Sequence, residues 1–431
     1  MKLHRPSLSN RHGTLLKNTV MLYLLQFSNY ILALAAVPYE TRVLGTTVYG
    51  NLGTAMAVMV YFQLVIDFGF LLSATEEVSR SRADPRALRG IFTSVTLCKL
   101  SLAVISAASL LLLCQVIPAW QQKQDLLLLS FVSTVFASLM PDYLYRGLER
   151  MTAITVRTVL IRTFFTISIF FFLKRPEDVC VVPILNIIGN GCALAGAFLH
   201  IHRQMHLSFC RVSWREVWSA FRRSSTFFYS RIATTAYTAM NTVILDIVSA
   251  GGAVTGYYTS ADKLITTGKN ALTPISDSLY PYMVRNRDFK LIKKVLLITE
   301  PVIAVFCLCV FIWAEPLCAL IFGVDFAPAG AVLRAMLPVG VIILPSYLLG
   351  FPTLTAMGLS KHANYSVILG SIVHVCNLLI LFGTGHLNMV TLGCAVSLSE
   401  AAILLYRVLI IFKHRNLLRA AAVDSEKDVT S

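Results

Sequence analysis

Charged residues are scarce in this chain of 431 residues. They make up 14% of it, whereas a soluble domain carries about 25%. Hydrophobic residues make up 56% and fall into blocks of roughly 20, the length that a helix needs to cross about 30 Å of hydrocarbon. A soluble protein of this composition would have too little polar surface to face water. The scarcity of charge therefore excludes a soluble globular protein and predicts an all-α, polytopic membrane protein.

The chain also lacks the residue patterns of several other protein classes. Its ten cysteines show no paired spacing, and most, such as Cys98 and Cys307, fall inside apolar blocks, where free thiols behave as small apolar residues. We therefore expect no disulfide framework, no metal site, no cofactor and no catalytic residues. A Gly-Lys-Ser/Thr phosphate-binding loop is also missing from the sequence. Energy for any transport must then come from an ion gradient or from the gradient of the cargo.

The formal net charge of +15 is distributed in short basic clusters between the apolar blocks. Lysine and arginine in cytoplasmic loops set the orientation of membrane proteins, so this distribution argues against a nucleic-acid partner. The basic N-terminus leads into an apolar block that is too long for a signal peptide and is interpreted as the first span. Loops after even-numbered spans and the C-terminal end, including Arg407 and Lys413, hold most of the remaining charge. We predict that both termini are cytoplasmic.

Twelve apolar blocks are long enough to be spans. They lie near residues 16–37, 48–74, 91–117, 126–146, 152–173, 179–200, 224–249, 253–281, 291–313, 330–357, 363–382 and 389–412. The longest connection, 203–223, mixes Trp214, Val217, Trp218 and Phe221 with arginines and is predicted to be an amphipathic helix in the membrane interface. We therefore predict an N-terminal six-helix lobe (1–202), a cytoplasmic interfacial linker (203–223), a C-terminal six-helix lobe (224–412) and a cytoplasmic tail (413–431).

Cationic residues inside the predicted spans are candidates for substrate binding. A charge in hydrocarbon costs at least a few kcal/mol, so such residues normally face a partner or a water-filled cavity. Arg162 and Lys263 lie roughly 15 Å into their spans, and Arg231 lies about 10 Å in. We expect these three to face a cavity. Arg157 lies close to the end of its span, so its side chain either faces the cavity or extends to the membrane interface.

Acidic residues in or near the spans are candidates for coupling or gating. Asp262 and Lys269 are seven residues apart on nearly the same helix face, which suits either a transport site or an ion pair that only holds the bundle together. Asp67 lies four residues after Gln63 and is either a protonatable coupling acid or a hydrated carboxylate near the cytoplasmic end. Glu76 follows near the end of the same span. Both interpretations stay open for Asp67 and for the Asp262–Lys269 set.

Several strings between about residues 60 and 285 resemble one family of transporters. They are Asp67-Phe68-Gly69-Phe70, Met140-Pro141, Arg146-Gly147-Leu148-Glu149-Arg150-Met151, Tyr229-Ser230-Arg231, Gly256-Tyr257-Tyr258, Ala261-Asp262-Lys263 and Pro274-Ile275-Ser276. Their order and spacing resemble the O-antigen and capsule repeat-unit flippases of the multidrug/oligosaccharidyl-lipid/polysaccharide (MOP) exporter superfamily. The sequence departs from that pattern at Glu76, Arg146 and Asp246, so no family role is carried over to Asp246.

The resemblance implies two six-helix lobes that form a V-shaped bundle around a central cationic cavity. It also implies transport of an undecaprenyl-diphosphate-linked repeat unit from the cytoplasmic to the periplasmic leaflet of the bacterial inner membrane. Expected partners are this glycan, membrane lipid, a coupling ion (proton or sodium) and the polysaccharide polymerase machinery. The cavity residues would be Arg162, Arg231, Lys263, Lys269 and Arg157, and the coupling or gating residues Asp67, Asp262 and Glu76.

Two rival functions remain at this point. A drug exporter of the same superfamily would share the spans but extrude a cation, which favours buried acids over buried arginine and lysine. A membrane enzyme of polysaccharide assembly would need a sizeable non-cytoplasmic loop or an acidic metal-binding motif, and no loop after an odd-numbered span is long enough. The buried cations therefore favour the flippase.

Overall fold

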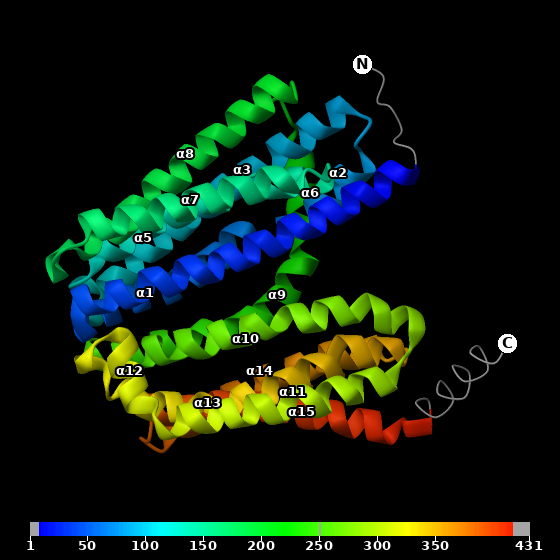
Figure 1. The fold of residues 1–431 in the computed structure, drawn as a ribbon. Coiled ribbons are helices and arrows are strands. Elements are labelled where there is room, and N and C mark those ends of the chain that lie inside the picture. Colours follow the sequence, from blue (N-terminus) through cyan, green and yellow to red (C-terminus); the bar gives the residue numbers. More distant parts are fainter. Residues whose placement is uncertain (1–7, 250, 417–431) are drawn as a thin grey trace. The chain divides into compact units, whose positions relative to one another are not determined.

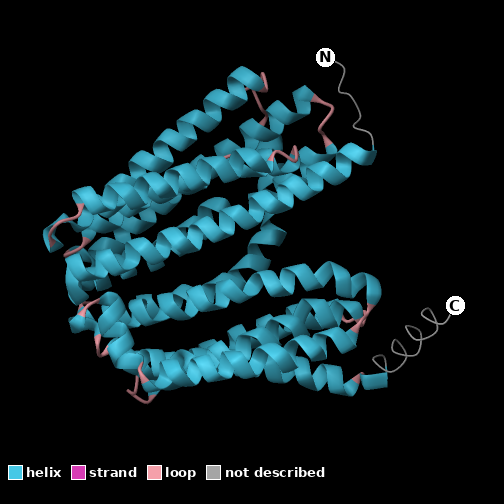
Figure 2. Cartoon of the chain, viewed as in Figure 1, coloured by secondary structure: helices cyan, strands magenta, loops and turns pink. Residues whose placement is uncertain are grey.

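The computed structural model describes the backbone of residues 8–249 and 251–416, with the side chains of 8–31, 33, 34, 151, 153, 230 and 233–238 left out. Helices and their connections account for all of this part of the chain, and no strand occurs in it (Figures 1 and 2). In chain order the elements are α1 (Leu8–Asp67), α2 (Phe70–Arg80), α3 (Pro85–Val116), α4 (Pro118–Gln121), α5 (Gln124–Ser138), α6 (Asp142–Gly147), α7 (Met151–Phe172), η1 (Pro176–Cys180), α8 (Val181–Gln204), α9 (Trp214–Val248), α10 (Ala253–Asn286), α11 (Phe289–Ile312), α12 (Ala314–Phe322), η2 (Val324–Phe326), α13 (Ala329–Leu348), η3 (Leu349–Leu354), α14 (Ser360–Gly383) and α15 (Met389–Lys413). The all-α prediction is confirmed.

Nine helices within the described residues are long and apolar enough to cross a membrane. Their outer surfaces are apolar: on α11, Leu297, Val302 and Phe306 are all exposed. A helix that shows apolar side chains to its surroundings is stable in lipid but not in water. The chain is therefore a multi-pass membrane protein. Helix α10 is long enough but not apolar enough to be among the nine, and α9 adds the shorter apolar stretch Ala239–Val248, so the count of twelve stays a prediction.

Breaks in the backbone divide the first predicted spans. Inside α1, Gly45 leaves the helical conformation with φ 69° and ψ 178°, close to the end of the predicted connection between spans one and two. The predicted second span, 48–74, is interrupted where Phe68 (φ 39°) and Gly69 (φ 78°) separate α1 from α2. Glycine takes a positive φ at little cost, whereas phenylalanine does not, so packing around Phe68 must hold this break. Most side chains of the first predicted span, 16–37, lie outside the described residues.

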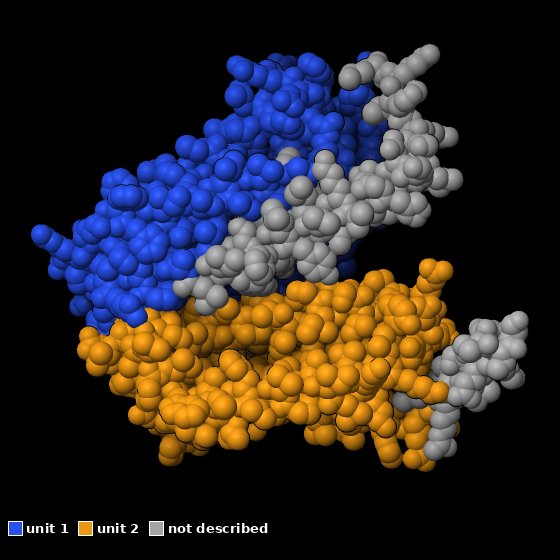
Figure 3. Space-filling view, viewed as in Figure 1, with its two compact units in different colours: residues 1–48, 54–232 blue, residues 49–53, 233–431 orange. Residues whose placement is uncertain are grey.

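The chain divides into two compact units (Figure 3). Unit 1 comprises residues 1–48 and 54–232, and unit 2 comprises residues 49–53 and 233–431. Helix α9 contributes to both, since it runs without interruption from Trp214 to Val248. Residues 214–223, expected as a separate interfacial helix, are the first turns of this longer helix. The lobe boundaries near 202 and 224 stay a prediction.

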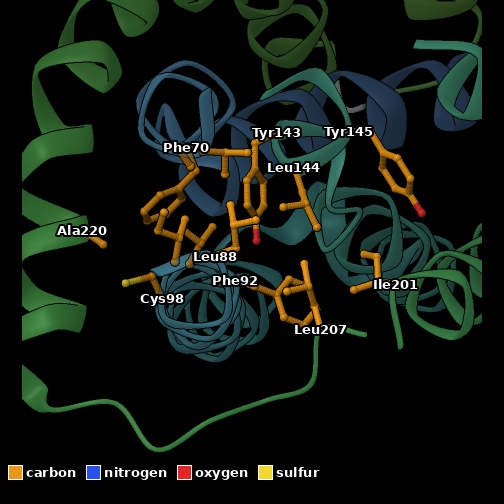
Figure 4. Close-up of a cluster of buried hydrophobic side chains, with 14 of the residues drawn as sticks. Phe70, Leu88, Phe92, Cys98, Tyr143, Leu144, Tyr145, Ile201, Leu207 and Ala220 are labelled. Carbon is orange, nitrogen blue, oxygen red and sulfur yellow. The ribbon is translucent and has the colours of Figure 1, made fainter. Parts of the chain in front are cut away.

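A hydrophobic cluster in unit 1 joins α2, α3, α6, α8 and α9 (Figure 4). Phe70, Phe92, Tyr143 and Leu144 are at most 2% exposed there, and Ala220 packs from α9. On the first turns of α9, Val217 and Phe221 face this cluster while Trp214 and Trp218 are 75% and 55% exposed. Of the four apolar residues predicted on one face of this segment, Val217 and Phe221 are therefore packed against protein, whereas the two tryptophans are exposed.

Unit 2 is organised around α13, which packs against α10, α11 and α15. Met283, Leu344 and Leu348 form the centre of a cluster at the α10–α13 contact. Pro338 and Pro345 lie inside α13, and Pro352 lies in the π-helix η3, where Gly350 has ψ −115°. Proline removes a backbone hydrogen bond, and π-helical turns bend a helix. The three prolines thus lie on a helix that is bent at its end.

Candidate functional site

The charged residues of the spans fall into ion pairs, a cavity and a few exposed cations. In unit 1, Lys99 Nζ of α3 lies 3.1 Å from Asp67 Oδ1 at the end of α1. Lys99 also donates to the carbonyl of Ser138 and is almost fully buried. A buried charge is tolerated when it has a partner and further hydrogen bonds. Asp67, a candidate coupling acid, is therefore in an ion pair that joins two helices.

Two other predicted site residues of unit 1 also have acidic or basic partners. Arg157 on α7 donates to Asp142 Oδ1 on α6 at 2.6 Å, with both side chains largely buried. Glu76 on α2 accepts from Arg80, one helical turn later, and both side chains are mostly exposed. Exposed pairs of this kind contribute little to stability. Neither a cavity role for Arg157 nor a gating role for Glu76 is tested by these contacts, so both stay predictions.

The break at Phe68 and Gly69 is held against α9. The Phe68 ring stacks between Phe221 at 4.2 Å and Phe228 at 4.3 Å. A Cβ on Gly69 would lie 2.8 Å from the Cβ of Phe227, so a larger residue would push the two helices apart. Beyond the break, Ser73 shares a hydrogen bond with Ser224 at 2.6 Å. The string that carried the family resemblance therefore docks α2 on α9.

Three predicted cavity residues are exposed. They are Arg162 on α7, Arg231 on α9 and Lys263 on α10. Within the described part of the chain, the side chains of Arg162 and Lys263 form no hydrogen bond and no ion pair. Arg162 and Arg231 belong to unit 1 and Lys263 to unit 2. An exposed cation at membrane depth needs water or an anion. A cationic cavity that all three residues share stays a prediction.

The three predicted site residues of α10, Asp262, Lys263 and Lys269, have different surroundings. Lys269 Nζ lies 2.6 Å from Glu400 Oε1 on α15, and this pair is mostly buried. Asp262 is half-buried beside the exposed Lys263. Lys269 thus forms an ion pair with a residue of a different helix. The sequence placed Glu400 in the last span but did not identify it as the partner, since 131 residues separate the two.

Arg407 was assigned from the sequence to the basic residues that flank the last span, and this was wrong. It is 5% exposed inside α15, where Nη1 donates to the carbonyl and hydroxyl of Ser346 and Nε donates to the Ser366 hydroxyl at 2.9 Å. A Cβ on Gly350 would lie 2.7 Å from Arg407 Nη1, so the glycine of the π-helix makes room for the guanidinium. Its position six residues inside the end of α15 was the available signal.

Arg407 and the Lys269–Glu400 pair border the same cavity in unit 2. Its volume is about 320 Å³. It is lined by Lys269, Thr273, Ser276, Asp277, Ile343, Ser346, Tyr347, Phe351, Val367, Glu400, Ile403 and Arg407. Two cations, two carboxylates and several hydroxyl groups thus meet in one space between α10, α13, α14 and α15. Such a cavity offers hydrogen bonds and charge of both signs to a polar group.

A buried polar network lies deeper in unit 2. His374 on α14 contacts Asn241 Oδ1 through Nε2 at 2.9 Å and Ser399 Oγ through Nδ1 at 3.0 Å. Asn241 in turn donates to the Tyr258 hydroxyl at 2.8 Å. All four residues are buried, so the network fixes the register of α9, α10, α14 and α15. His374 was not among the residues predicted from the sequence, although a lone histidine in an apolar span was a visible signal.

No group of three or more histidine, cysteine or acidic side chains suited to a metal occurs among the described residues. The contacts that the structure describes at the charged sites are hydrogen bonds and ion pairs. Exposed cations on α7, α9 and α10 suit an anionic ligand, because arginine in particular matches the geometry of phosphate oxygens. These features suit the binding of an anionic group.

Comparison with known proteins gives a family and two relatives along most of the chain. The family model described as "Polysaccharide biosynthesis protein" matches residues 15–287. A protein of Shigella dysenteriae named "Putative O-antigen transporter" is 24% identical over 366 residues, which cover 83% of this chain and 91% of that protein. A protein of Escherichia coli (strain K12) with the same name is 25% identical over 412 residues, which cover 94% of this chain and 98% of that protein.

Solved structures share the fold at low sequence identity. The lipid II flippase MurJ, in an inward closed conformation, aligns with a TM-score of 0.70 and 13% identity over 95% of this chain and 90% of its own. A multidrug resistance MATE family transporter of the MOP superfamily, in an inward-facing conformation, aligns with a TM-score of 0.68 and 12% identity over 91% of this chain and 95% of its own. The fold is therefore that of flippases and exporters.

Proposed function

Because this chain belongs to the polysaccharide biosynthesis protein family, we propose that it is a flippase for a lipid-linked oligosaccharide. It is a transporter rather than an enzyme, as are its relatives. The cargo is an undecaprenyl-diphosphate-linked repeat unit of an O-antigen or capsule, which moves from the cytoplasmic to the periplasmic leaflet of the bacterial inner membrane. The names of both relatives support an O-antigen precursor.

The exposed cations at membrane depth are the observation that carries this function. Arg162 and Lys263 are exposed without hydrogen bonds or ion pairs to any described residue, whereas Asp67 and Glu400 are neutralised by lysines. Each unit thus presents an exposed cation within a predicted span. A diphosphate group, which carries several acceptor oxygens and negative charge, is the cargo chemistry that such cations attract.

Alternating access coupled to an ion gradient completes the proposal. The bent α13–η3 segment and the break between α1 and α2 are positions where helices of each unit can change direction. Asp67 forms an ion pair with Lys99, and Asp262 is half-buried beside a cation. Asp67, Asp262 and Glu76 are accordingly the proposed coupling or gating residues, with a proton or sodium as the coupling ion. Both termini are proposed to be cytoplasmic, and the polysaccharide polymerase machinery is a proposed partner.

Deletion of the gene in its native host tests the proposal. We expect an undecaprenyl-diphosphate-linked repeat unit to accumulate on the cytoplasmic face, and the wild-type gene to restore surface polysaccharide. Replacing both Arg162 and Lys263 by glutamine should reduce that restoration at unchanged protein abundance. A matched control is the double variant Lys174→Gln/Arg175→Gln, which removes the same charge at the outer end of α7. Unchanged lipid-linked glycans in the deletion strain would refute a flippase function.

A multidrug exporter is the second candidate, and one residue favours it. Asp277 on α10 is an exposed carboxylate that lines the unit 2 cavity, and a cationic drug would be attracted to it. In that case the deletion strain would become sensitive to cationic drugs while its glycans stay normal. Asp277→Asn would then abolish drug resistance, whereas the flippase proposal expects it to leave drug resistance unaffected.

A further inference from the structure

Unit 1 contains a groove between the end of α2 and the beginnings of α3 and α9. Its volume is about 540 Å³. It is lined by Glu77, Ser81, Asp84, Arg86, Ala87, Gly90, Ile91, Ser94, Val95, Arg215, Glu216, Ser219, Ala220 and Arg223. Three arginines and three carboxylates occur in this lining. Formal charge alone would make the groove neutral, so the partners of each group decide what it can bind.

All three carboxylates of the groove have partners within the protein. Glu77 accepts from Arg223 Nη2 through both of its oxygens at 2.9 Å. Asp84 caps α3 and accepts from the backbone N–H groups of Arg86 and Ala87. Glu216 accepts from the backbone N–H of Ser213 at 2.6 Å in the first turn of α9. The acids are therefore engaged in holding the helix ends and one of the arginines.

Two arginines of the groove are left available. The side chains of Arg86 and Arg215 are exposed, and neither makes a hydrogen bond or an ion pair with any residue that the structure describes. Each lies in the first turn of its helix, where the helix dipole disfavours a positive charge. An external anion would relieve this repulsion. Two guanidinium groups that line one groove offer the forked donors that phosphate oxygens accept.

Aromatic residues next to the groove indicate its depth in the membrane. Trp214 and Trp218, on the same turns of α9 as Arg215, are both exposed, and so is Phe209 just before the helix. Tryptophan is enriched at the level of the lipid headgroups, and basic residues beside it attract anionic lipids. The helix ends that line the groove also belong to the Arg-rich connections between predicted spans, and we predict that these connections are cytoplasmic.

We propose that this groove is a binding site for the phosphate of an anionic phospholipid, held by Arg86 and Arg215 and flanked by Trp214 and Trp218. A bound lipid would tie the first turn of α9 to α3 through its headgroup. Glu77, Ser73 and Gly69 already fix the adjacent part of α9 to α2. The lipid would thus complete the attachment of α9, the helix that contributes to both units. This site is independent of the proposed cargo.

Lipid titration of the purified full-length protein in detergent tests the proposal. Native mass spectrometry would count phosphatidylglycerol and phosphatidylcholine molecules that remain bound at fixed salt. We expect phosphatidylglycerol to bind the wild type in preference to phosphatidylcholine. Arg86→Gln/Arg215→Gln should weaken phosphatidylglycerol binding roughly tenfold, because two charge-assisted contacts are lost. Arg86→Lys/Arg215→Lys should retain part of the binding, since the charge remains without the fork.

The matched control is Arg211→Gln/Arg222→Gln. It removes the same charge from two exposed arginines of the same segment that do not line the groove. We expect less than a twofold change. Equal losses in the two double variants would show diffuse attraction and overturn the site.

Two further probes, inorganic phosphate and farnesyl diphosphate, distinguish the possible sources of the anion. Binding of farnesyl diphosphate without phosphatidylglycerol would mean that the groove receives the cargo, and would overturn the phospholipid assignment.

Discussion

Among the residues that the structure describes, unit 1 contains the buried pair Lys99–Asp67 and unit 2 the buried pair Lys269–Glu400, and the two pairs have different surroundings. In unit 1, Lys99 joins Asp67 and also donates to a backbone carbonyl. In unit 2, Lys269 joins Glu400 at the wall of a cavity that Arg407 also lines. The first pair is enclosed by protein on the lysine side, whereas the second can be reached from the cavity. Loss of the enclosed Lys99 is therefore expected to lower stability most, whereas loss of Glu400 at the cavity wall is expected to affect transport more than stability.

Removing Lys99 should give the largest loss of stability. Lys99→Met leaves Asp67 without its cation in a largely buried position, and breaking a buried pair costs about 3 kcal/mol or more. Unfolding in a graded denaturant should show this loss in the free energy of unfolding. The double variant Lys99→Met/Asp67→Leu removes both charges and should recover most of it. A stable single variant would show that the pair is not enclosed as described.

Replacing Glu400 by glutamine should lower transport more than it lowers stability. Glu400→Gln keeps the shape but leaves Lys269 to the cavity, where water can solvate it, so we expect the free energy of unfolding to fall by only about 1–2 kcal/mol. Glycan export in the complementation assay should fall much further. If Glu400→Gln instead costs as much stability as Lys99→Met and the remaining folded protein exports normally, the two pairs have the same structural role.

Adding a side chain at Gly69, where α2 and α9 approach each other closely, should have an intermediate effect on the stability of unit 1. Gly69→Ala adds a Cβ beside Phe227 at a residue with φ 78°, and both strain and the clash oppose it. We expect the thermal midpoint of unfolding in detergent to fall by an amount that corresponds to roughly 1–3 kcal/mol. Gly90→Ala is the control, since a Cβ there meets no atom within 4 Å. Equal midpoints for the two variants would contradict the packing of α2 on α9.

The exposed pair of unit 2 should matter least. Glu315 on α12 and Arg334 on α13 lie 2.6 Å apart, as close as Lys269 and Glu400, but both are partly or mostly exposed. Glu315→Gln should therefore change the free energy of unfolding by about 0.5 kcal/mol or less, and leave export unchanged. A large loss would mean that the short distance, rather than burial, decides the contribution of these pairs.

Local patterns along the chain were sufficient for the membrane class and most helices. A block of roughly 20 apolar residues must form a helix in hydrocarbon, because its backbone groups have no other partners there. This is a property of each block by itself, so spans such as 291–313 and 389–412 agree closely with α11 and α15. The amphipathic pattern of residues 214–223 was likewise visible in the sequence. That these residues form the start of α9 was not predicted, because the tryptophans and arginines there interrupt the apolar pattern of the span that follows.

The sequence by itself determined most of the charges that enter the membrane and the family that the chain resembles; only the tertiary structure decided which partners those charges have. The partner of Asp67 lies 32 residues away and that of Lys269 lies 131 residues away. No local spacing encodes such a pairing, because it depends on which faces of which helices meet. Arg407 makes the same point: its burial requires the glycine of a π-helix on a different segment to open the space. Hydrophobicity places a helix in the membrane, but packing assigns each charge its partner.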